Sequence, residues 1–349
     1  MTATFDVGAH SQSLVGHHYR LDDYYEVGRE KIREYARAVQ DYHPAHWQEA
    51  AAGELGYTGL VASPTFFSIP AMLANRRLFE SVITGYDVYV QTDQVFEWYA
   101  PVVAGDRLTS DVELSSVRRI AGKDLLTVTN TFTDESGCVV QVMHTTVVGI
   151  TADEVDPGIG DAMKSVLMHG LDVNAPATTV QDGAQGSAEQ SPSAKVALST
   201  RIAAPRAPHT SVRFDEVAVG DTLTPRTVAL TRGDLVNYAG VSGDANPIHW
   251  NDRIAKLAGL PDVIAHGMLT MACGAGFVTD WLGDPGALAK YTVRLSNYTV
   301  VEANAVGTVE YSGRIKSVDP ESKTAVVLIT AKSAGRKIFG LATAEVRLS

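Results

Sequence analysis

Cysteine is scarce in this 349-residue chain, which holds only Cys138 and Cys273. Two thiols are too few for a disulfide framework or a structural zinc site, so we expect both to be small buried side chains. Long apolar runs are missing too, since the longest, around residues 268–278, is too short and glycine-rich to span a membrane. The start, MTATFDVGAHSQSL, lacks the basic and apolar regions of a signal peptide. We therefore expect a cytoplasmic protein.

Positive charge is in the minority. The chain has 29 Lys and Arg against 40 Asp and Glu, a formal net charge of −11, whereas nucleic-acid binding needs a basic surface. No Gly-x-Gly-x-x-Gly stretch opens a helix after a strand, so no dinucleotide cofactor is indicated. The remaining composition, 45% hydrophobic and 20% charged, is that of an ordinary soluble protein. At about 100–200 residues per domain, the length predicts two domains.

The chain contains an internal repeat. Residues 32–62 align without a gap on residues 235–265, at a constant offset of 203. The identical pairs are Tyr35 and Tyr238, Ala36 and Ala239, Asp41 and Asp244, Pro44 and Pro247, His46 and His249, Trp47 and Trp250, Ala52 and Ala255, Gly56 and Gly259, and Ala62 and Ala265. A match with this period excludes a short-period solenoid and predicts two related domains.

Both copies show the same order of predicted elements. Ile32, Tyr35, Ala36 and Val39 have the spacing of an amphipathic helix, and an apolar, buried helix starts near Pro64 or Gly267. Strand-like runs follow at 88–98, 106–117, 124–133 and 139–150, and at 290–301, 306–318, 324–332 and 338–348. Short turns between them favour antiparallel hairpins. We predict an α+β fold in which a curved antiparallel sheet wraps a long buried helix in each copy.

The composition changes between the copies. Residues 154–209 are rich in Ala, Gly, Gln, Ser and Pro, which is typical of a flexible linker, and DAMKSVLMHG at 161–170 allows one short helix. We therefore predict domains at 12–150 and 211–349, joined by a linker at 151–210.

The most informative stretch is YAGVSGDANPIHW at 238–250. It brings Asp244, Asn246 and His249 into one turn, where an acid and an imidazole whose ordinary pKa values differ by about 2.6 units can exchange protons near neutrality. Taken alone, such a pair is more often a turn-and-cap arrangement. A metal site is also conceivable, but one His and one Asp are too few ligands, and the spacing offers no third.

Gly267 opens the buried helix of the second copy. Its N–H is an unpaired donor at the positive end of the helix dipole, a favourable place for a developing oxyanion, and a glycine lets a substrate approach the backbone closely. His266 precedes it and is interpreted as a capping or packing residue rather than a base.

Together, GDANPIHW and the following AHGM resemble the signature of the MaoC-like dehydratases, the (R)-specific enoyl-thioester hydratases. The resemblance covers residues 14–150 and 211–349 and implies a double hotdog fold. It implies a hydro-lyase that removes water from a (3R)-3-hydroxyacyl thioester or adds it to a trans-2-enoyl thioester, with no cofactor and no metal. The implied catalytic residues are Asp244, Asn246, His249 and Gly267, and the implied substrate-binding residues are Tyr238, Gly243, Trp250 and His266. Arg294 resembles a position packed behind the site.

The first copy departs from this signature. It keeps Asp41 and His46, but Asn246 is replaced by His43, and Gly267 by Pro64, which has no N–H to offer an oxyanion. Ser63 stands at the position of His266. We expect the first half to pair with the second within the chain and shape the acyl pocket without performing chemistry.

The stretch YYEVGREKIREYARAVQ resembles the non-catalytic subunit of two-subunit 3-hydroxyacyl-ACP dehydratases of fatty acid elongation, and the second half resembles their catalytic subunit. An acyl thioester of acyl carrier protein is the implied substrate. The alternatives are an (R)-specific enoyl-CoA hydratase of fatty acid breakdown, a hotdog thioesterase, and a non-enzymatic acyl-binding partner. An acidic carrier requires a basic patch, for which the candidates are Arg118, Arg119, Lys316, Lys332, Arg336 and Lys337. The assembly is one chain or a homodimer of it.

Overall fold

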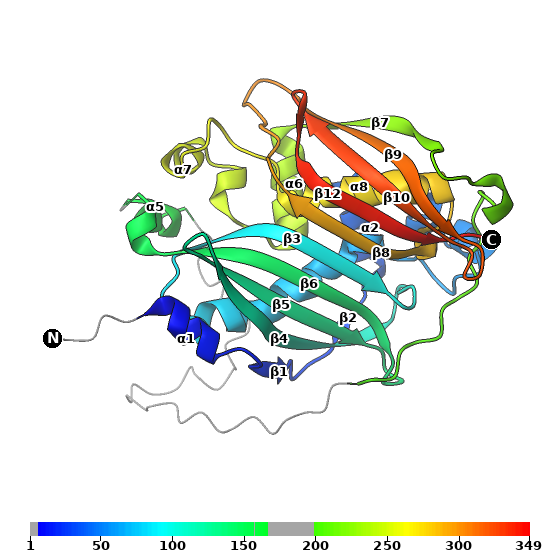
Figure 1. Cartoon of the computed structure of the whole chain (residues 1–349), viewed down its shortest axis with the longest axis horizontal. Helices are drawn as coiled ribbons and strands as arrows, with labels where there is room; N and C mark the ends of the chain where they lie inside the picture. The colour runs from blue at the N-terminus through cyan, green and yellow to red at the C-terminus, as the bar shows by residue number, and fades with distance from the viewer. Residues whose placement is uncertain (1–5, 157, 167–198) are drawn as a thin grey trace.

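The computed structural model describes residues 6–156, 158–166 and 199–349. Within them, one antiparallel sheet runs in the order β1-β4-β5-β6-β3-β8-β12-β10-β9-β7, with β2 beside β4 and β11 beside β10. Strands of the N-terminal half fill one side of this sheet and strands of the C-terminal half the other, and β3 and β8 join them (Figure 1).

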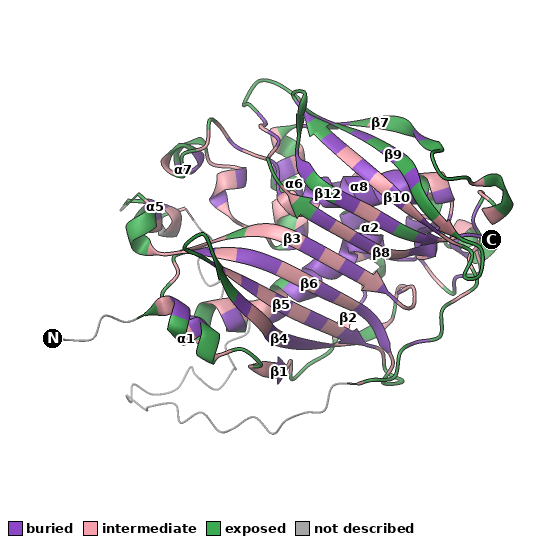
Figure 2. Cartoon of the chain, in the orientation of Figure 1, coloured by how far each residue is buried: buried purple, intermediate pink, exposed green. Residues whose placement is uncertain are grey.

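The strands of the first half are β1 His18–Arg20, β2 Tyr25–Glu26, β3 Val88–Trp98, β4 Arg107–Ile120, β5 Lys123–Thr133 and β6 Val139–Ile150. Those of the second half are β7 Thr222–Leu230, β8 Leu288–Leu295, β9 Gly307–Asp319, β10 Thr324–Ser333, β11 Arg336–Lys337 and β12 Phe339–Arg347. Their side chains alternate between buried and more exposed positions (Figure 2), because one face of the sheet covers the core.

The α-helices are α1 Val7–Ser13, α2 Arg29–Ala38, α3 Glu49–Glu54, α4 Ser68–Arg77, α5 Ile159–Lys164, α6 Arg232–Ser242, α7 Asp252–Leu257 and α8 Gly267–Leu282. The short helices are η1 Pro44–His46, η2 Pro64–Phe67, η4 Ala152–Glu154, η6 Phe214–Glu216, η7 Pro247–His249 and η8 Pro285–Ala287, all 3-10, and η3 Leu78–Val82, a π-helix.

Helix α8 is the buried helix predicted for the second half. A Cβ added to Gly274 would lie 2.5 Å from the Tyr291 hydroxyl, so glycine lets the helix approach the sheet closely. In the first half the corresponding path runs through η2, α4 and η3. Each half therefore wraps its sheet around a central helix, and the predicted α+β double hotdog is confirmed.

Two details of the second half differ from the predicted strands. The run predicted at 290–301 leaves the sheet at Leu295, and β7 was not expected. Strand β7 contains Pro225, which argues against a strand because proline cannot donate to a ladder. It is tolerated here because β7 lies at the edge of the sheet, and the register shifts between Leu223 and Arg226.

Helices α2 and α6 pack against each other where the halves meet. The rings of Tyr35 and Tyr238, equivalent positions of the repeat, lie 6.4 Å apart there. The Tyr35 hydroxyl donates to the Thr65 carbonyl over 2.9 Å. Repeated residues thus meet each other across the junction.

A second junction forms around Asp284, whose side chain is fully buried. Its carboxylate accepts hydrogen bonds from the Tyr57 hydroxyl of the first half, from Arg206 Nη1 at 2.9 Å and from the backbone N–H of His209 at 2.8 Å. Arg206 also donates to the Leu55 carbonyl. We call this group the Asp284 junction.

Part of the predicted linker lies on the first half. The N–H of Ala203 donates to the Val139 carbonyl over 3.0 Å, and Val139 N–H donates to the Arg201 carbonyl over 2.8 Å. Residues 167–198, which include the end of the helix predicted at 161–170, lie outside the described residues. Cys273 is buried as predicted, but Cys138 is only partly buried, beside Arg201. No helix of the described residues is long and apolar enough to cross a membrane.

Candidate active site

The signature turn begins where helix α6 ends. Gly243 caps the helix with a φ of 81°, in the left-handed region that favours glycine. Asp244 Oδ1 then accepts from the Asn246 N–H at 3.3 Å, and Asn246 Oδ1 accepts from the Ile248 N–H at 3.2 Å. The short polar side chains cap the backbone of this turn, which delivers His249 at the end of η7.

Three of the predicted site residues come together. Ligating atoms of Asp244, His249 and His266 all lie within 4.8 Å of one another. The rings of His249 and His266 stack with centroids 3.8 Å apart and planes 28° apart. The sequence therefore places two residues of the turn and one residue of the α8 start at a single point.

His249 is held in one orientation. Its Nδ1 lies 2.8 Å from the Ile264 carbonyl oxygen, which can only accept, so Nδ1 carries the proton and Nε2 of the neutral ring is the basic atom. Burial lowers the pKa of His249 below its ordinary value, although Asp244 opposes this shift. The result is a neutral imidazole with an available lone pair, as a general base requires.

His266 is fully buried between other rings. Burial and the neighbouring His249 lower the pKa of His266 well below its ordinary value. Its Nε2 lies 3.3 Å from the Asp244 carbonyl oxygen, and its ring centroid lies 4.8 Å from that of Tyr238. His266 packs directly on the candidate base, and its predicted contact with substrate stays a prediction.

The cluster contains a third potential metal ligand that the sequence spacing did not reveal. His266 joins Asp244 and His249 in a set with the ligand types of a 2-His-1-carboxylate site. The two imidazoles lie nearly face to face, however, and the lone pairs of stacked rings lie in their ring planes and do not converge on one ion. We therefore interpret the cluster as acid–base machinery.

Gly267 begins helix α8 directly after His266. A Cβ added to Gly267 would lie 2.7 Å from Leu295 Cδ1 and 3.8 Å from Gln91 Oε1. Gln91 belongs to β3 of the first half. The start of α8, with its unpaired N–H groups, thus lies at the junction of the two halves.

Two further predicted residues support the turn. Tyr238 is 1% exposed and lies between His266 and Tyr35. The indole N–H of Trp250 donates to the Ala245 carbonyl over 3.1 Å. Their predicted contact with substrate stays a prediction. Arg294 does not pack behind the site: it is 65% exposed and pairs with Asp93.

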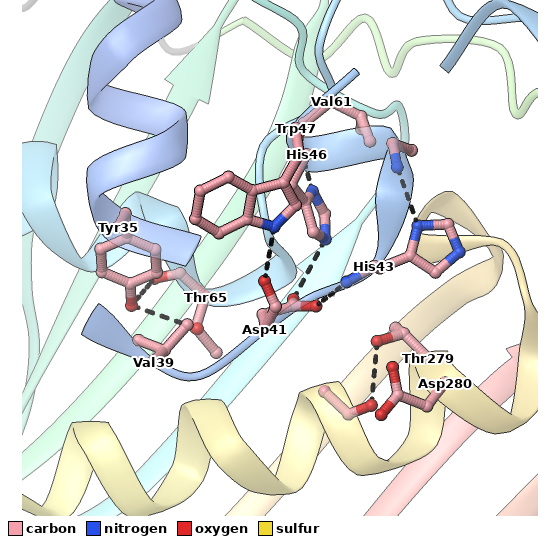
Figure 3. Close-up of polar contacts among 12 residues, drawn as sticks. Tyr35, Val39, Asp41, His43, His46, Trp47, Val61, Thr65, Thr279 and Asp280 are labelled. Atoms are coloured by element: carbon pink, nitrogen blue, oxygen red, sulfur yellow. Dashed lines mark hydrogen bonds and ion pairs between the residues drawn. The ribbon is translucent and has the colours of Figure 1, made fainter. Parts of the chain in front are cut away.

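The first half repeats the turn, but here the acid and the imidazole contact each other directly and are buried, which we call the closed turn (Figure 3). His46 Nε2 forms an ion pair with Asp41 Oδ2 at 3.1 Å, and the two side chains are 0% and 2% exposed. The Trp47 indole donates to the Asp41 carbonyl over 3.1 Å, as Trp250 does to Ala245. His43 Nδ1 accepts from the Ala45 N–H, so it caps the turn in place of Asn246.

Residues of the second half lie directly against this closed turn. His43 Nε2 is 3.1 Å from the Gly283 carbonyl, and Asp280 of α8 lies beside it (Figure 3). Burial opposes charge on Asp41, but His46 lowers the pKa of Asp41 to about 2. Burial likewise opposes charge on His46, yet Asp41 raises its pKa above the ordinary value. The pair is buried, and each partner favours the charged form of the other.

Comparison with known proteins identifies the class. Residues 13–143 match the FAS1-like dehydratase domain region, and residues 211–333 match the MaoC-like domain. A solved structure described as a MaoC-like dehydratase is 56% identical, covers 97% of this chain and 100% of its own, and superposes with a TM-score of 0.88. The chain belongs to the MaoC-like dehydratase family.

Other relatives match one half or the fold alone. A UPF0336 protein of Mycolicibacterium paratuberculosis is 44% identical over 152 residues, which is 43% of this chain and 96% of that protein, and it aligns with the N-terminal half. A double hotdog protein of Mycobacterium tuberculosis shares the fold, with a TM-score of 0.59 at 12% identity and 99% coverage of both chains.

Proposed function

We propose that the second half, residues 211–349, is a hydro-lyase site that converts (3R)-3-hydroxyacyl thioesters and trans-2-enoyl thioesters into each other. The observation that carries this proposal is the convergence of Asp244, a neutral His249 and the start of α8 at Gly267. An acid–base pair together with a nearby backbone donor is what elimination of water beside a thioester carbonyl requires.

In the dehydration direction, His249 Nε2 accepts the proton from C2. The electrons of the broken C–H bond form the C2=C3 double bond, and the thioester oxygen that gains negative charge during this step is held by the Gly267 N–H. The C3–O bond breaks as the hydroxyl receives, through Asp244, the proton that His249 removed from C2, and the hydroxyl leaves as water. Hydration reverses these steps, with Asp244 and His249 holding the attacking water and Asn246 orienting it.

The first half, residues 12–150, is proposed to shape the acyl pocket without catalysing. Two observations support this role. Its Asp41–His46 pair is buried as an ion pair under residues of the second half, and its central helix begins at Pro64, which has no N–H to donate. The start of α8 in the catalytic half, by contrast, lies beside Gln91 of the first half.

The proposed carrier is acyl carrier protein in fatty acid elongation, because both halves resemble the subunits of two-subunit 3-hydroxyacyl-ACP dehydratases. A basic hairpin supports an acidic partner: Lys332, Arg336 and Lys337 are exposed, and none of them forms an ion pair within the described part of the chain. The Lys337 carbonyl accepts from Asn297 Nδ2 at 2.9 Å, two residues beyond the Leu295 that contacts the Gly267 position. The alternative carrier is CoA.

Crotonyl-CoA provides the first test. Loss of the ultraviolet absorbance of its conjugated double bond, with formation of 3-hydroxybutyryl-CoA, is the expected result. Release of free thiol instead would identify a thioesterase, and no change would indicate an acyl-binding protein. Repeating the assay with acyl-ACP and acyl-CoA of matched chain lengths separates the two carriers.

A further inference from the structure

The seam between the halves carries opposite charges on its two strands. On β3, Asp93 and Glu97 lie on the outer face of the sheet, and on β8, Lys290 and Arg294 lie opposite them in register. Arg294 Nε is 2.8 Å from Asp93 Oδ1 and Lys290 Nζ is 2.5 Å from Glu97 Oε1. Strand β3 supplies both acidic residues and strand β8 both basic residues.

The repeat shows that these positions are equivalent. Ala62 N–H donates to the Val102 carbonyl, and its counterpart Ala265 N–H donates to the Thr299 carbonyl. Val102 therefore corresponds to Thr299, and by the same offset Val95 corresponds to Thr292. Val95 and Thr292 face each other, so the approximate two-fold axis that relates the halves passes between them.

This symmetry fixes what self-pairing of either half would bring together. Asp93 is equivalent to Lys290, and Glu97 to Arg294. If two first halves paired by the same geometry, Asp93 of one copy would face Glu97 of the other. Two second halves would place Lys290 opposite Arg294. Like charges directly opposite on neighbouring strands are destabilising, whereas opposite charges stabilise the pair.

We propose that these four residues determine which edges pair, so that the acidic β3 edge accepts a basic β8 edge and rejects a second copy of itself. The other contacts of these residues lie within one half and do not change with the partner: the Tyr99 hydroxyl donates to Glu97, and Lys290 lies opposite Glu345 of β12. Of the contacts that these four side chains make, only the two seam ion pairs change with the partner. With four contacts changing from attraction to repulsion, unlike pairing is favoured on the order of a hundredfold.

Two matched full-length variants test this proposal, and both keep two ion pairs in the normal seam. D93R/R294D exchanges one pair, so that each strand then carries one acid and one base and can pair with itself. D93R/E97K/K290E/R294D reverses both pairs and leaves self-pairing repulsive. After refolding from urea at low ionic strength, we expect D93R/R294D to form at least about tenfold more oligomer than wild type, and the four-fold reversal to behave like wild type in size-exclusion chromatography.

The substitution V95C identifies the strands that meet. Val95 lies on the axis, so a disulfide between two chains at this position reports β3 against β3. We expect this cross-link in the D93R/R294D background and its absence in the reversed background, with the difference reduced in high salt because charge pairs are screened. Equal oligomer and equal cross-linking in the two backgrounds, whether low or high, would overturn the proposal.

Discussion

In the first half, Asp41 and His46 lie 3.1 Å apart, each favours the charged form of the other, and both are shielded from solvent. In the second half, ligating atoms of the corresponding Asp244 and His249 lie within 4.8 Å of each other, but the two residues form no ion pair among the described residues, and burial lowers the pKa of His249. An imidazole that is protonated by its acidic partner has no lone pair with which to take a proton from a substrate. Keeping the two residues near each other without an ion pair, beside a glycine-started helix, leaves both available for a substrate.

Removing the acid or the base of the second half should have the largest effect. We expect His249→Ala and Asp244→Asn each to lower kcat by roughly 10²–10⁴, the usual size of an acid–base contribution. The matched change Asp41→Asn, measured per folded molecule in the crotonyl-CoA assay, should leave kcat near the wild-type value. An equal loss from Asp41→Asn would contradict the assignment of a single active half.

A second prediction transfers the proline of the first half to the second. Gly267→Pro removes the proposed oxyanion donor, and proline is tolerated at the first position of a helix, so kcat should fall by about 10²–10³ while the fold is kept. Gly267→Ala is the control: it adds the same Cβ toward the end of the flexible Leu295 side chain but retains the N–H. Equal losses from the two variants would show that the Cβ, and not the missing donor, is responsible.

A third prediction concerns stability in the closed half. Asp41→Asn leaves the buried His46 without its partner and should lower the free energy of unfolding by about 3–5 kcal/mol. The folded-state pKa of Asp41 is about 2, below its unfolded value, so its contribution is present above about pH 4 and is lost as the pH falls toward 2. Urea denaturation of both proteins across this range should show the difference shrinking, and a constant difference would contradict it.

The smallest effect is expected in the pH profile. The pKa of His249 is lowered, so the neutral base persists below its ordinary value of about 6.5. The acidic limb of kcat/KM should therefore fall at a pH below 6.5. His46 titrates in the opposite direction: its pKa is raised, so its ion pair stabilises the fold fully below pH 6.5 and is lost as the pH rises through the raised value. An acidic limb above pH 6.5 would indicate that His249 is not the base.

Much of the fold was predictable because it follows from periodicity. The repeat gave two copies, the alternating runs gave eight of the strands, and the apolar stretch after Gly267 gave the buried helix α8. Strand β7 was missed because Pro225 argues against a strand unless its place at the sheet edge is known.

The candidate site was predictable only as a set of residues. Local spacing placed Asp244, Asn246 and His249 in one turn, but the stacking of His266 on His249 depends on how α8 meets that turn in three dimensions. The burial of Asp41 and His46 likewise depends on how the second half packs onto their turn, as in the contact between His43 and Gly283, which are 240 positions apart in the chain. Asp41 and His46 have the same residue types as Asp244 and His249, but the residue types alone did not show how differently the two pairs are placed.

The Asp284 junction has a consequence for how this chain can change. One buried carboxylate of the second copy receives the Tyr57 hydroxyl of the first and the Arg206 guanidinium of the connecting segment. Three positions that are remote in sequence are therefore constrained by a single group. After a duplication, two copies can ordinarily change independently. Here a substitution at Tyr57, Arg206 or Asp284 affects the partners in the rest of the chain, so these positions are expected to change together.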